Sequence, residues 1–527
     1  MSINTISHLL NRATILSPNK IALIDGYKRY TYLELKDEVD RVAEYLETLS
    51  IPKGSRVGIY SNKSSSQVVA ILAILSTNYM LVPITRLLKP HQVKHIIDDC
   101  NIRCMITDNS KISLLKNINF EGKIISYDNH IDSNVSFSEI FKFYTGDIKS
   151  TLYGHSSAVI TYSFGSQGDP KGVVIDHRAL IDGARVVSNY LDIQENDIIS
   201  GVLSFNLDYG LNQIFSSLYM GATLIIHRFL LPSDFFTHLI NDKITILPLM
   251  PIHITETFSE DPHKIPSPEH FKNLKTITSS GGNITPIMLE NIEKHFKYSK
   301  FYAMHGLTEA FRSTYLEPSQ LKIRPTSIGK AIPDVELYII DADGNQCKSG
   351  EIGELIHRGA CIYKGYWNDR EETTKRFKSI KILDKVIEPE GELTDEIVIA
   401  SGDFVYADEE GYIHFISRAD DMIKTRGYRV NPYEIEKVID THIINITSRV
   451  IFSIPNDDIE EEIILVYSAE NRLSKNEIIL ELKRHLPHYM IPEQIEYREI
   501  MPLKSLHERE PDRDIVKNEF LESRRES

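Results

Sequence analysis

Hydrophobic residues in the first half of the chain follow two alternating spacings. From Leu35 to Leu46 they recur three or four residues apart with charged residues between them, which predicts an amphipathic helix over 31–49. A second helix is predicted at 67–75. Short continuous apolar runs, which are typical of buried strands, alternate with the predicted helices. The alternation indicates crossover units on a parallel sheet. The predicted strands are 56–60, 80–84, 104–106, 124–126, 198–203, 223–226, 244–247 and 276–278.

The pattern changes after Ile328. Short alternating runs at 336–340, 353–358 and 412–416 are interrupted by Gly and Asp. This pattern of short, interrupted strands predicts a small antiparallel sheet or barrel.

A compact α+β unit is expected after Asp420. An acidic helix is predicted from Tyr433, strands at 449–454 and 462–469, and a further helix after Ser474. Ser474 with Glu477 has the spacing of a capping box. The expected fold is therefore α/β: a large N-terminal body (1–419) of parallel-sheet crossover layers plus the small β sheet or barrel, and a small mobile α+β C-terminal cap domain (420–527).

Composition excludes some classes of protein. The 527 residues carry a formal net charge of −15, which argues against nucleic acid as a partner. Four cysteines in so long a chain do not form a disulfide framework or a zinc pattern. The N-terminus lacks a signal-peptide pattern, and the most apolar stretch, 68–75, is too short to span a membrane. A cytoplasmic protein without a membrane span is expected.

A glycine-rich loop at 161–172 is the first candidate for chemistry. Gly165 and Gly168 permit backbone conformations that a Cβ forbids, so that Ser163, Ser166 and backbone N–H groups can face a phosphate, with Lys171 adding a positive charge. The common NTPase loop pattern is absent. Taken alone, the loop is a weak signal and is better explained as a surface turn.

Further polar segments follow in order. A Ser-Gly-Gly-Asn turn begins at Ser280, and His305-Gly-Leu-Thr-Glu309 contains a carboxylate suited to Mg²⁺. A Gly-Glu-Leu run with Tyr363-Lys-Gly-Tyr-Trp comes next, then Ser401-Gly-Asp, and finally a charged stretch over 417–436. Taken one at a time, some of these segments are equally well explained as a structural turn or as a histidine packed in the core.

Together these segments resemble the adenylate-forming superfamily of acyl-CoA synthetases, luciferases and peptide-synthetase adenylation domains, and are nearest to bacterial AMP-forming acyl-CoA ligases. The resemblance extends from 31–35 to 486–492. It implies catalytic roles for Lys171, Thr308, Glu309 and Arg429, with Glu309 also the metal ligand, Asp420 as hinge and Gly427 lining a thiol tunnel. The implied nucleotide-binding residues are Ser163, Gly165, Ser166, Gln167, Gly168, Gly281, Gly282, Asn283, His305, Gly306, Asp403 and Arg418.

The run 204–212 resembles the family's acyl-pocket segment, with Asp208 and Tyr209 as substrate residues. Asp208 lies near the position where amino-acid-activating members place an aspartate against the substrate ammonium. Related acyl-CoA ligases carry the same Asp-Tyr-Gly run, so both substrate classes stay open.

The chain departs from the family pattern in two places, the glycine-rich loop and the C-terminal motif. Phe164 and Gln167 stand where small hydroxyl residues are usual, and Glu510 stands where the family has a C-terminal lysine that bridges the substrate carboxylate and the α-phosphate. A carboxylate there would repel both anions, and losing the cation costs roughly a hundredfold or more in rate. Arg509 or Lys504 could replace it, the thiol half-reaction alone could survive, or catalysis could be lost.

The expected function is an AMP-forming ligase. It would use ATP and Mg²⁺ to convert a small carboxylic acid to an acyl-adenylate, then transfer the acyl group to CoA or to phosphopantetheine on an acyl carrier protein. One alternative is a stand-alone amino-acid-activating enzyme. Another is a catalytically impaired homologue that binds a nucleotide or acts as a scaffold. A luciferase-like oxygenase has no distinguishing residue here.

Overall fold

The computed structural model describes most of the chain. The described residues are 3–149, 151–163, 170–229, 232–259, 264–282, 284–388, 395–418, 423–425, 428–430, 432–456, 459–486, 488–503 and 511–525.

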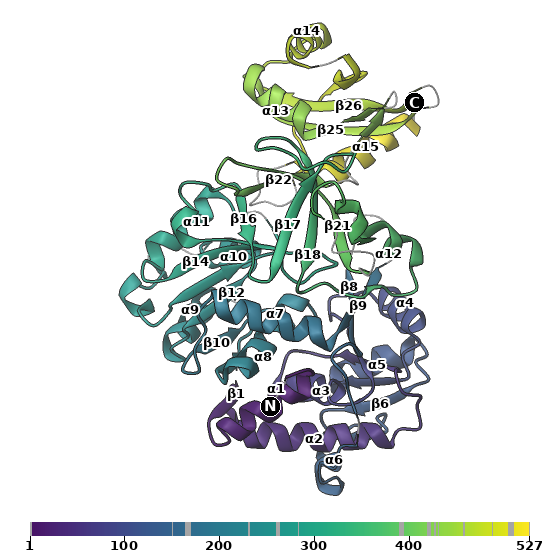
Figure 1. Cartoon of the computed structure of the whole chain (residues 1–527), viewed down its shortest axis with the longest axis vertical. Helices are drawn as coiled ribbons and strands as arrows, with labels where there is room; N and C mark the ends of the chain where they lie inside the picture. The colour runs from purple at the N-terminus through teal and green to yellow at the C-terminus, as the bar shows by residue number, and fades with distance from the viewer. Residues whose placement is uncertain are drawn as a thin grey trace. The chain divides into compact units, whose positions relative to one another are not determined.

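The first sheet is built from the predicted crossover units (Figure 1). Its strand order is β19-β9-β8-β4-β3-β5-β6-β7, and the strands from β8 to β7 pair in parallel through β4, β3, β5 and β6. The other edge is antiparallel, because β8 and β9 flank the glycine-rich loop as a hairpin. The strands are β3 Arg56–Tyr60, β4 Met80–Pro83, β5 Cys104–Thr107, β6 Lys123–Ser126, β7 Val135–Ser136, β8 Ser157–Ser163, β9 Lys171–Asp176 and β19 Gly365–Tyr366.

The second sheet continues the same architecture. β1, β11, β10, β12, β13 and β14 pair in parallel in that spatial order, and β2 closes one edge as an antiparallel partner of β1. These strands are β1 Ile21–Asp25, β2 Lys28–Thr31, β10 Ile198–Gly201, β11 Thr223–Ile226, β12 Ile246–Leu249, β13 Thr276–Ser279 and β14 Lys300–His305. The predicted α/β class is confirmed.

The antiparallel strands predicted after Ile328 are present, but they are not a separate sheet. They extend the second sheet beyond β14 through β15 and β16, so that the hydrogen-bonded path continues β15-β16-β22-β21-β18-β17, with β20 on β21. Their bounds are β15 Thr314–Leu316, β16 Ser327–Ala331, β17 Val335–Ile340, β18 Gly353–Gly359, β20 Phe377–Ser379, β21 Ile397–Ala407 and β22 Ile413–Arg418.

Helices cover these sheets with the faces that the sequence marks as apolar. The helix α2 (Tyr32–Thr48) buries Leu35 and Leu46 and begins with a capping box between Thr31 and Glu34. It packs on α3, and α7 packs on α8. The remaining bounds are α1 Ile6–Leu16, α3 Ser65–Ile74, α4 Pro90–Cys100, α5 Asn109–Asn117, α6 Phe137–Phe143, α7 His177–Tyr190, α8 Asp208–Met220, α9 Pro232–Asn241, α10 Pro251–Thr257, α11 Pro286–His295 and α12 Arg370–Arg376, with short 3₁₀ turns at Pro268–Phe271, Pro318–Gln320 and Ile380–Leu383.

Two predicted strand boundaries shifted for local reasons. The strand predicted at 244–247 is β12, which begins at Ile246, because the Ile244 N–H bonds back to the Leu239 carbonyl in the turn that ends α9. The strand predicted at 198–203 ends at Gly201. There Lys63 Nζ donates to the Gly201 and Val202 carbonyls at 2.7 and 2.5 Å, so a side chain takes part in the hydrogen bonding at this strand end.

The C-terminal segment has its own two-sided core. In β25 (Ile446–Asn456), Ile451 faces one side, whereas Val450 and Phe452 face the other, as strand alternation requires. One side packs on α13 and α14 and the other on α15, and β25 and β26 lie side by side in Figure 1. The bounds are β23 Ile423–Thr425, β24 Tyr428–Val430, β26 Glu460–Ala469, β27 Gln494–Tyr497, α13 Pro432–His442, α14 Lys475–His485, α15 Arg513–Arg525 and a 3₁₀ turn at His488–Met490. The capping box predicted between Ser474 and Glu477 is present.

By backbone contacts the chain divides into two compact units. The first comprises 1–350, 355–401 and 407–414, and the second comprises 351–354, 402–406 and 415–527. The division therefore crosses β18, β21 and β22, whereas the sequence places a single boundary at 419/420, which stays a prediction. No helix in the described part of the chain is long and apolar enough to cross a bilayer.

Candidate active site

Lys171 begins β9, directly after the glycine-rich loop. Its Nζ lies 3.0 Å from Asp369 Oδ2 and 3.0 Å from Glu372 Oε2, on the first turn of α12 and its cap. Partial burial lowers the pKa of Lys171, but the bonds to the two carboxylates outweigh it and the net shift is upward. The lysine is thus held charged at the mouth of the loop. Ser163 ends β8, and the predicted loop residues Gly165, Ser166, Gln167 and Gly168 lie outside the described residues.

Glu309 is the carboxylate predicted to hold Mg²⁺, and it is 1% exposed. Its Oε1 accepts a 2.6 Å hydrogen bond from the Tyr366 hydroxyl and lies 3.8 Å from Arg376 Nε. Arg376, itself buried, also lies 3.3 Å from Glu372, the partner of Lys171. Burial, then the Glu309 charge, raises the pKa of Tyr366, so its hydroxyl stays a donor. Lys171 and Glu309 therefore belong to one charged cluster.

One backbone segment, 361–367, holds these two motifs together. On one side the Tyr363 N–H donates to the Glu309 carbonyl at 3.0 Å, and Ala310 bridges to Ile362. On the other side, Gly365 and Tyr366 form β19, which pairs antiparallel with β9. The segment is hydrogen-bonded to both the Glu309 turn and the Lys171 strand, which fixes their separation through the main chain.

The turn that carries His305, Gly306 and Thr308 follows the end of β14. Ser313 N–H bonds to the His305 carbonyl, and Leu307 N–H bonds to the Ala310 carbonyl, so the chain folds back within a few residues. A Cβ on Gly306 would lie 2.6 Å from the Phe311 carbonyl oxygen, so only glycine fits there. His305 and Thr308 are partly exposed, as contact with a ligand requires.

The predicted adenine turn follows β13. Gly281 has φ +87°, a conformation suited to glycine, and a Cβ on Gly282 would come within 3.2 Å of Pro251 on α10. The backbone can therefore approach a flat ligand closely. Asn283 lies outside the described residues.

Asp208 and Tyr209, the candidate substrate residues, begin α8. The Asp208 carboxylate accepts from the Tyr209 N–H at 2.6 Å and from the Tyr363 hydroxyl at 3.3 Å. Desolvation raises the pKa of Asp208 against the opposing charge of Arg312. The Tyr209 hydroxyl lies 2.6 Å from Thr278 Oγ1 on β13. The candidate acyl residues thus touch strand β13 and segment 361–367.

In the second unit, Asp403 and Arg418, which the sequence predicts to contact the ribose and the nucleotide, lie close together. Arg418 Nε lies 3.4 Å from Asp403 Oδ1, and the Asp403 side chain is buried whereas that of Arg418 is about half exposed. The backbone of Arg429 lies in β24, opposite Lys424 of β23. Asp420, Gly427 and Glu510 lie outside the described residues.

Sequence reasoning missed several partners of the predicted residues. Tyr366 falls in a run interpreted only as a strand and turn, and Arg312 falls in the run after Glu309, to which no role was given. The acidic first turn and basic last turn of α12 were the available signal, because opposite charges four residues apart stabilise a short helix. The charge pattern did not show that three residues at this helix would contact Lys171 or Glu309. These residues are Asp369, Glu372 and Arg376.

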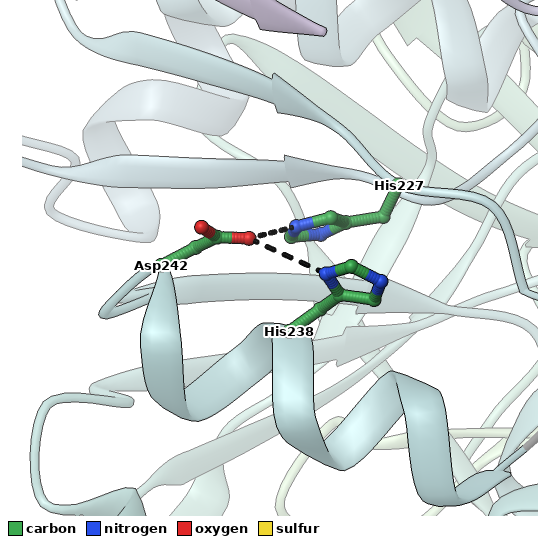
Figure 2. Close-up of side chains that lie close together, drawn as sticks. All are labelled: His227, His238 and Asp242. Carbon is green, nitrogen blue, oxygen red and sulfur yellow. Dashed lines mark hydrogen bonds and ion pairs between the residues drawn. The ribbon is translucent and has the colours of Figure 1, made fainter. Parts of the chain in front are cut away.

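Figure 2 shows a second polar cluster, formed by His227, His238 and Asp242. His227 Nε2 lies 2.9 Å from Asp242 Oδ2, and His238 Nδ1 lies 3.7 Å from the same oxygen. His227 Nδ1 lies 2.7 Å from Ser200 Oγ, so both nitrogens of this buried ring are engaged. Hydrogen bonding to His227 lowers the pKa of Asp242. The cluster ties the end of β11 to α9 by internal bonds.

The fold and the clustered motifs define a two-unit α/β protein with a glycine-rich loop, a buried carboxylate and a candidate acyl-pocket run in its larger unit. Residues 11–367 match the family model of the AMP-binding enzymes, and the chain belongs to this family. The family prediction made from the motifs is confirmed.

Known proteins agree with this assignment. The chain is 25% identical to gramicidin S synthase 1 of Brevibacillus brevis over 95% of its own length and 43% of that protein, and 25% identical to tyrocidine synthase 1 of Brevibacillus parabrevis over 95% of its length and 44% of that protein. It therefore spans less than half of these relatives. Among solved structures, a Mycobacterium tuberculosis fatty acyl CoA synthetase superposes with TM-score 0.82 at 20% identity, covering 98% of both chains. An o-succinylbenzoate CoA synthetase from Bacillus subtilis gives 0.72 at 23%, covering 97% of both.

Proposed function

We propose that this protein is an AMP-forming acid–thiol ligase. A carboxylate oxygen of the substrate attacks the α-phosphorus of ATP, the bond to the β,γ-phosphates breaks, and pyrophosphate leaves. A thiolate of CoA or carrier-bound phosphopantetheine then attacks the acyl carbon, and AMP leaves. Membership of the AMP-binding enzymes supports the first step, and the acyl-CoA synthetase fold supports the second.

The observation that carries this proposal is the double attachment of segment 361–367. It brings a charged lysine at the glycine-rich loop and a buried carboxylate into one hydrogen-bonded unit. A nucleotide phosphate beside Lys171 would compete with Asp369 and Glu372 for its ammonium group. The carboxylate of Glu309 has the oxygen chemistry that Mg²⁺ prefers, and Tyr366 orients it. Bound Mg²⁺ would neutralise phosphate charge.

The remaining predicted residues have roles in the same proposal. Asp403 would accept hydrogen bonds from the ribose hydroxyls, and Arg418 would contact the nucleotide. Gly281 and Gly282 would leave room for the adenine, against which His305 would stack. Rotation about Asp420 would bring Gly427 and Arg429 to the thiol step.

The test is ATP–pyrophosphate exchange over a panel of carboxylic and amino acids. We expect exchange with at least one acid, reduced at least about 100-fold in a Lys171→Ala, Glu309→Ala double variant. Lys116→Ala, which removes an exposed lysine paired with Asp132, is the matched control and should keep wild-type exchange. If no acid supports exchange above the double variant, adenylation is refuted.

The alternative of a silent nucleotide-binding relative rests on Glu510 together with Phe164. ATP binding by calorimetry without exchange would favour it. Higher turnover in Glu510→Lys than in the wild type would instead support an active site that lacks only the C-terminal lysine. An amino-acid substrate remains the second candidate, because the partly buried Asp208 carboxylate is suited to an ammonium group; exchange confined to amino acids in the panel would select it.

A further inference from the structure

Arg312 is a buried cation beside the candidate acyl residues. It follows the Ala310 bridge and is 3% exposed. Its guanidinium lies 4.8 Å from the ring of Tyr209 and 4.6 Å from the ring of Phe311. Two aromatic rings therefore lie beside this cation, and its N–H groups are the donors available to a further ligand.

One edge of the guanidinium is already used. Nη1 donates a 2.6 Å hydrogen bond to Ser280 Oγ, on the turn after β13. Within the described part of the chain, Nε and Nη2 have no hydrogen-bond partner, although both are buried. The charge of Arg312 acts on the Asp208 carboxylate and lowers its pKa against the effect of burial. The Asp208 oxygens, however, accept hydrogen bonds from the Tyr209 N–H and the Tyr363 hydroxyl, not from Arg312.

The two atoms without a partner are a matched pair. Nε–H and the adjacent Nη2–H point the same way along one side of the guanidinium plane, and this side is the one that grips both oxygens of a carboxylate. Arginine stays protonated even when buried, so the unmet demand for an acceptor cannot be relieved by losing a proton. A buried donor left without an acceptor is costlier than an ordinary hydrogen bond is stabilising. An anion with two oxygens meets this demand.

The surroundings place this edge in the acyl region. Tyr209 joins Arg312 to α8, Ser280 joins it to the predicted adenine turn, and Glu309 precedes it by three residues. Burial raises the pKa of Tyr190 against the opposing charge of Arg312, and the Tyr190 ring stacks on Tyr315 at 4.5 Å. The cation is therefore set among aromatic side chains rather than in a polar surface network.

We infer that Arg312 receives a second anionic group of the acid substrate, through Nε and Nη2, so that the substrate is a dicarboxylic acid. This inference rests on the proposed function and names the substrate class of that site. The far carboxylate binds Arg312 side-on, and the other carboxylate is the one that reacts with ATP. The Tyr209 and Phe311 rings hold the guanidinium edge in position.

The experiment compares acids of equal carbon number in the exchange assay: succinate against butyrate, and glutarate against pentanoate. With wild-type protein we expect kcat/KM to favour the dicarboxylate of the better pair by at least about 100-fold, because a buried donor pair rejects a substrate that lacks the acceptor. Equal or greater activity with the monocarboxylates overturns the inference and leaves the proposed function standing. No exchange with any acid removes the proposed function, and this inference with it.

Variants separate recognition from structural support. Arg312→Gln should lower kcat/KM for the dicarboxylate about 100-fold while changing that for the monocarboxylate less than about threefold, and Arg312→Lys should recover part of the loss. Arg324→Gln is the matched control, since Arg324 also stacks on a tyrosine, Tyr412, at 4.3 Å and pairs with Asp408. An equal loss with both acids in Arg312→Gln, together with a lower melting temperature, identifies a structural cation and overturns the inference.

Discussion

At the scale of single residues, the site depends on partners that come from distant positions. Glu309 is oriented by a hydroxyl 57 residues away, on Tyr366, and Lys171 by carboxylates about 200 residues further along. Each of these bonds is between a charged group and a donor or acceptor held on β19 or α12. Removing one such partner therefore changes the position of the charge as well as the stability of the fold.

Tyr366→Phe tests this dependence. The variant keeps the ring and removes the donor to buried Glu309, so we expect the free energy of unfolding to fall by about 2 kcal/mol, as for a hydrogen bond to a charged group. Exchange activity should fall about tenfold as the carboxylate loses its orientation. Urea unfolding and the exchange assay measure the two effects.

The matched control is Tyr338→Phe, which removes a 2.7 Å bond to Glu336 at an exposed edge. Its stability should change by less than about 0.5 kcal/mol, because water replaces the lost partner. Similar losses in the two variants would mean that burial of Glu309 adds nothing to this bond.

At the scale of elements, a buried histidine makes one strand sensitive to pH. His357 in β18 is fully buried, lies 3.0 Å from Ser313 Oγ through Nδ1, and donates from Nε2 to the Ala360 carbonyl at 2.9 Å. Burial lowers the pKa of His357 to about 4 from an ordinary 6.5. The folded protein thus excludes a proton that the unfolded chain takes up below pH 6.5.

Stability should therefore fall as pH falls from about 6.5 to about 4, by up to roughly 3 kcal/mol for this group. His357→Gln removes the titrating ring, so its free energy of unfolding in urea should depend less on pH between 7 and 5 than that of the wild type. His91→Gln, at an exposed position of α4, should keep the wild-type dependence. An unchanged pH dependence in His357→Gln would contradict the assignment.

At the scale of the whole molecule, two units carry separate cores. Phe520 of α15 packs on Val450 and Phe452 of β25 within the second unit. Phe215 of α8 lies in the main core of the first unit. Units with their own cores can unfold at different temperatures.

We expect Phe520→Ala to lower one calorimetric transition and leave the other near its wild-type position, and Phe215→Ala to do the reverse. Each removes a buried aromatic ring, which costs about 3–5 kcal/mol in its own unit. Scanning calorimetry of the intact chain measures both transitions. A single transition that moves equally in both variants would show that the units unfold together.

Much of the fold was accessible from the sequence because its signals are local. Periodicity places α2, the acidic helix predicted from Tyr433 is α13, the strand predicted at 462–469 is β26, and the Ser474–Glu477 spacing predicts a real cap. The hairpin β8–β9 was not predicted, because the residues of its strands were interpreted only as part of a phosphate-binding loop. The division into units was also predicted differently, because segments such as 402–406 join the second unit through contacts rather than chain order.

The sequence by itself determined the alternation of strands and helices in the first half of the chain, the resemblance to the AMP-binding family, and the identity of Lys171 and Glu309 as candidates, because spacing and residue type lie along the chain. Only the tertiary structure decided that segment 361–367 joins those two motifs and that Arg312, within the described part of the chain, has two buried donors without a hydrogen-bond partner. Hydrogen bonds between distant segments depend on how the sheets bring the chain together, and no local pattern records them.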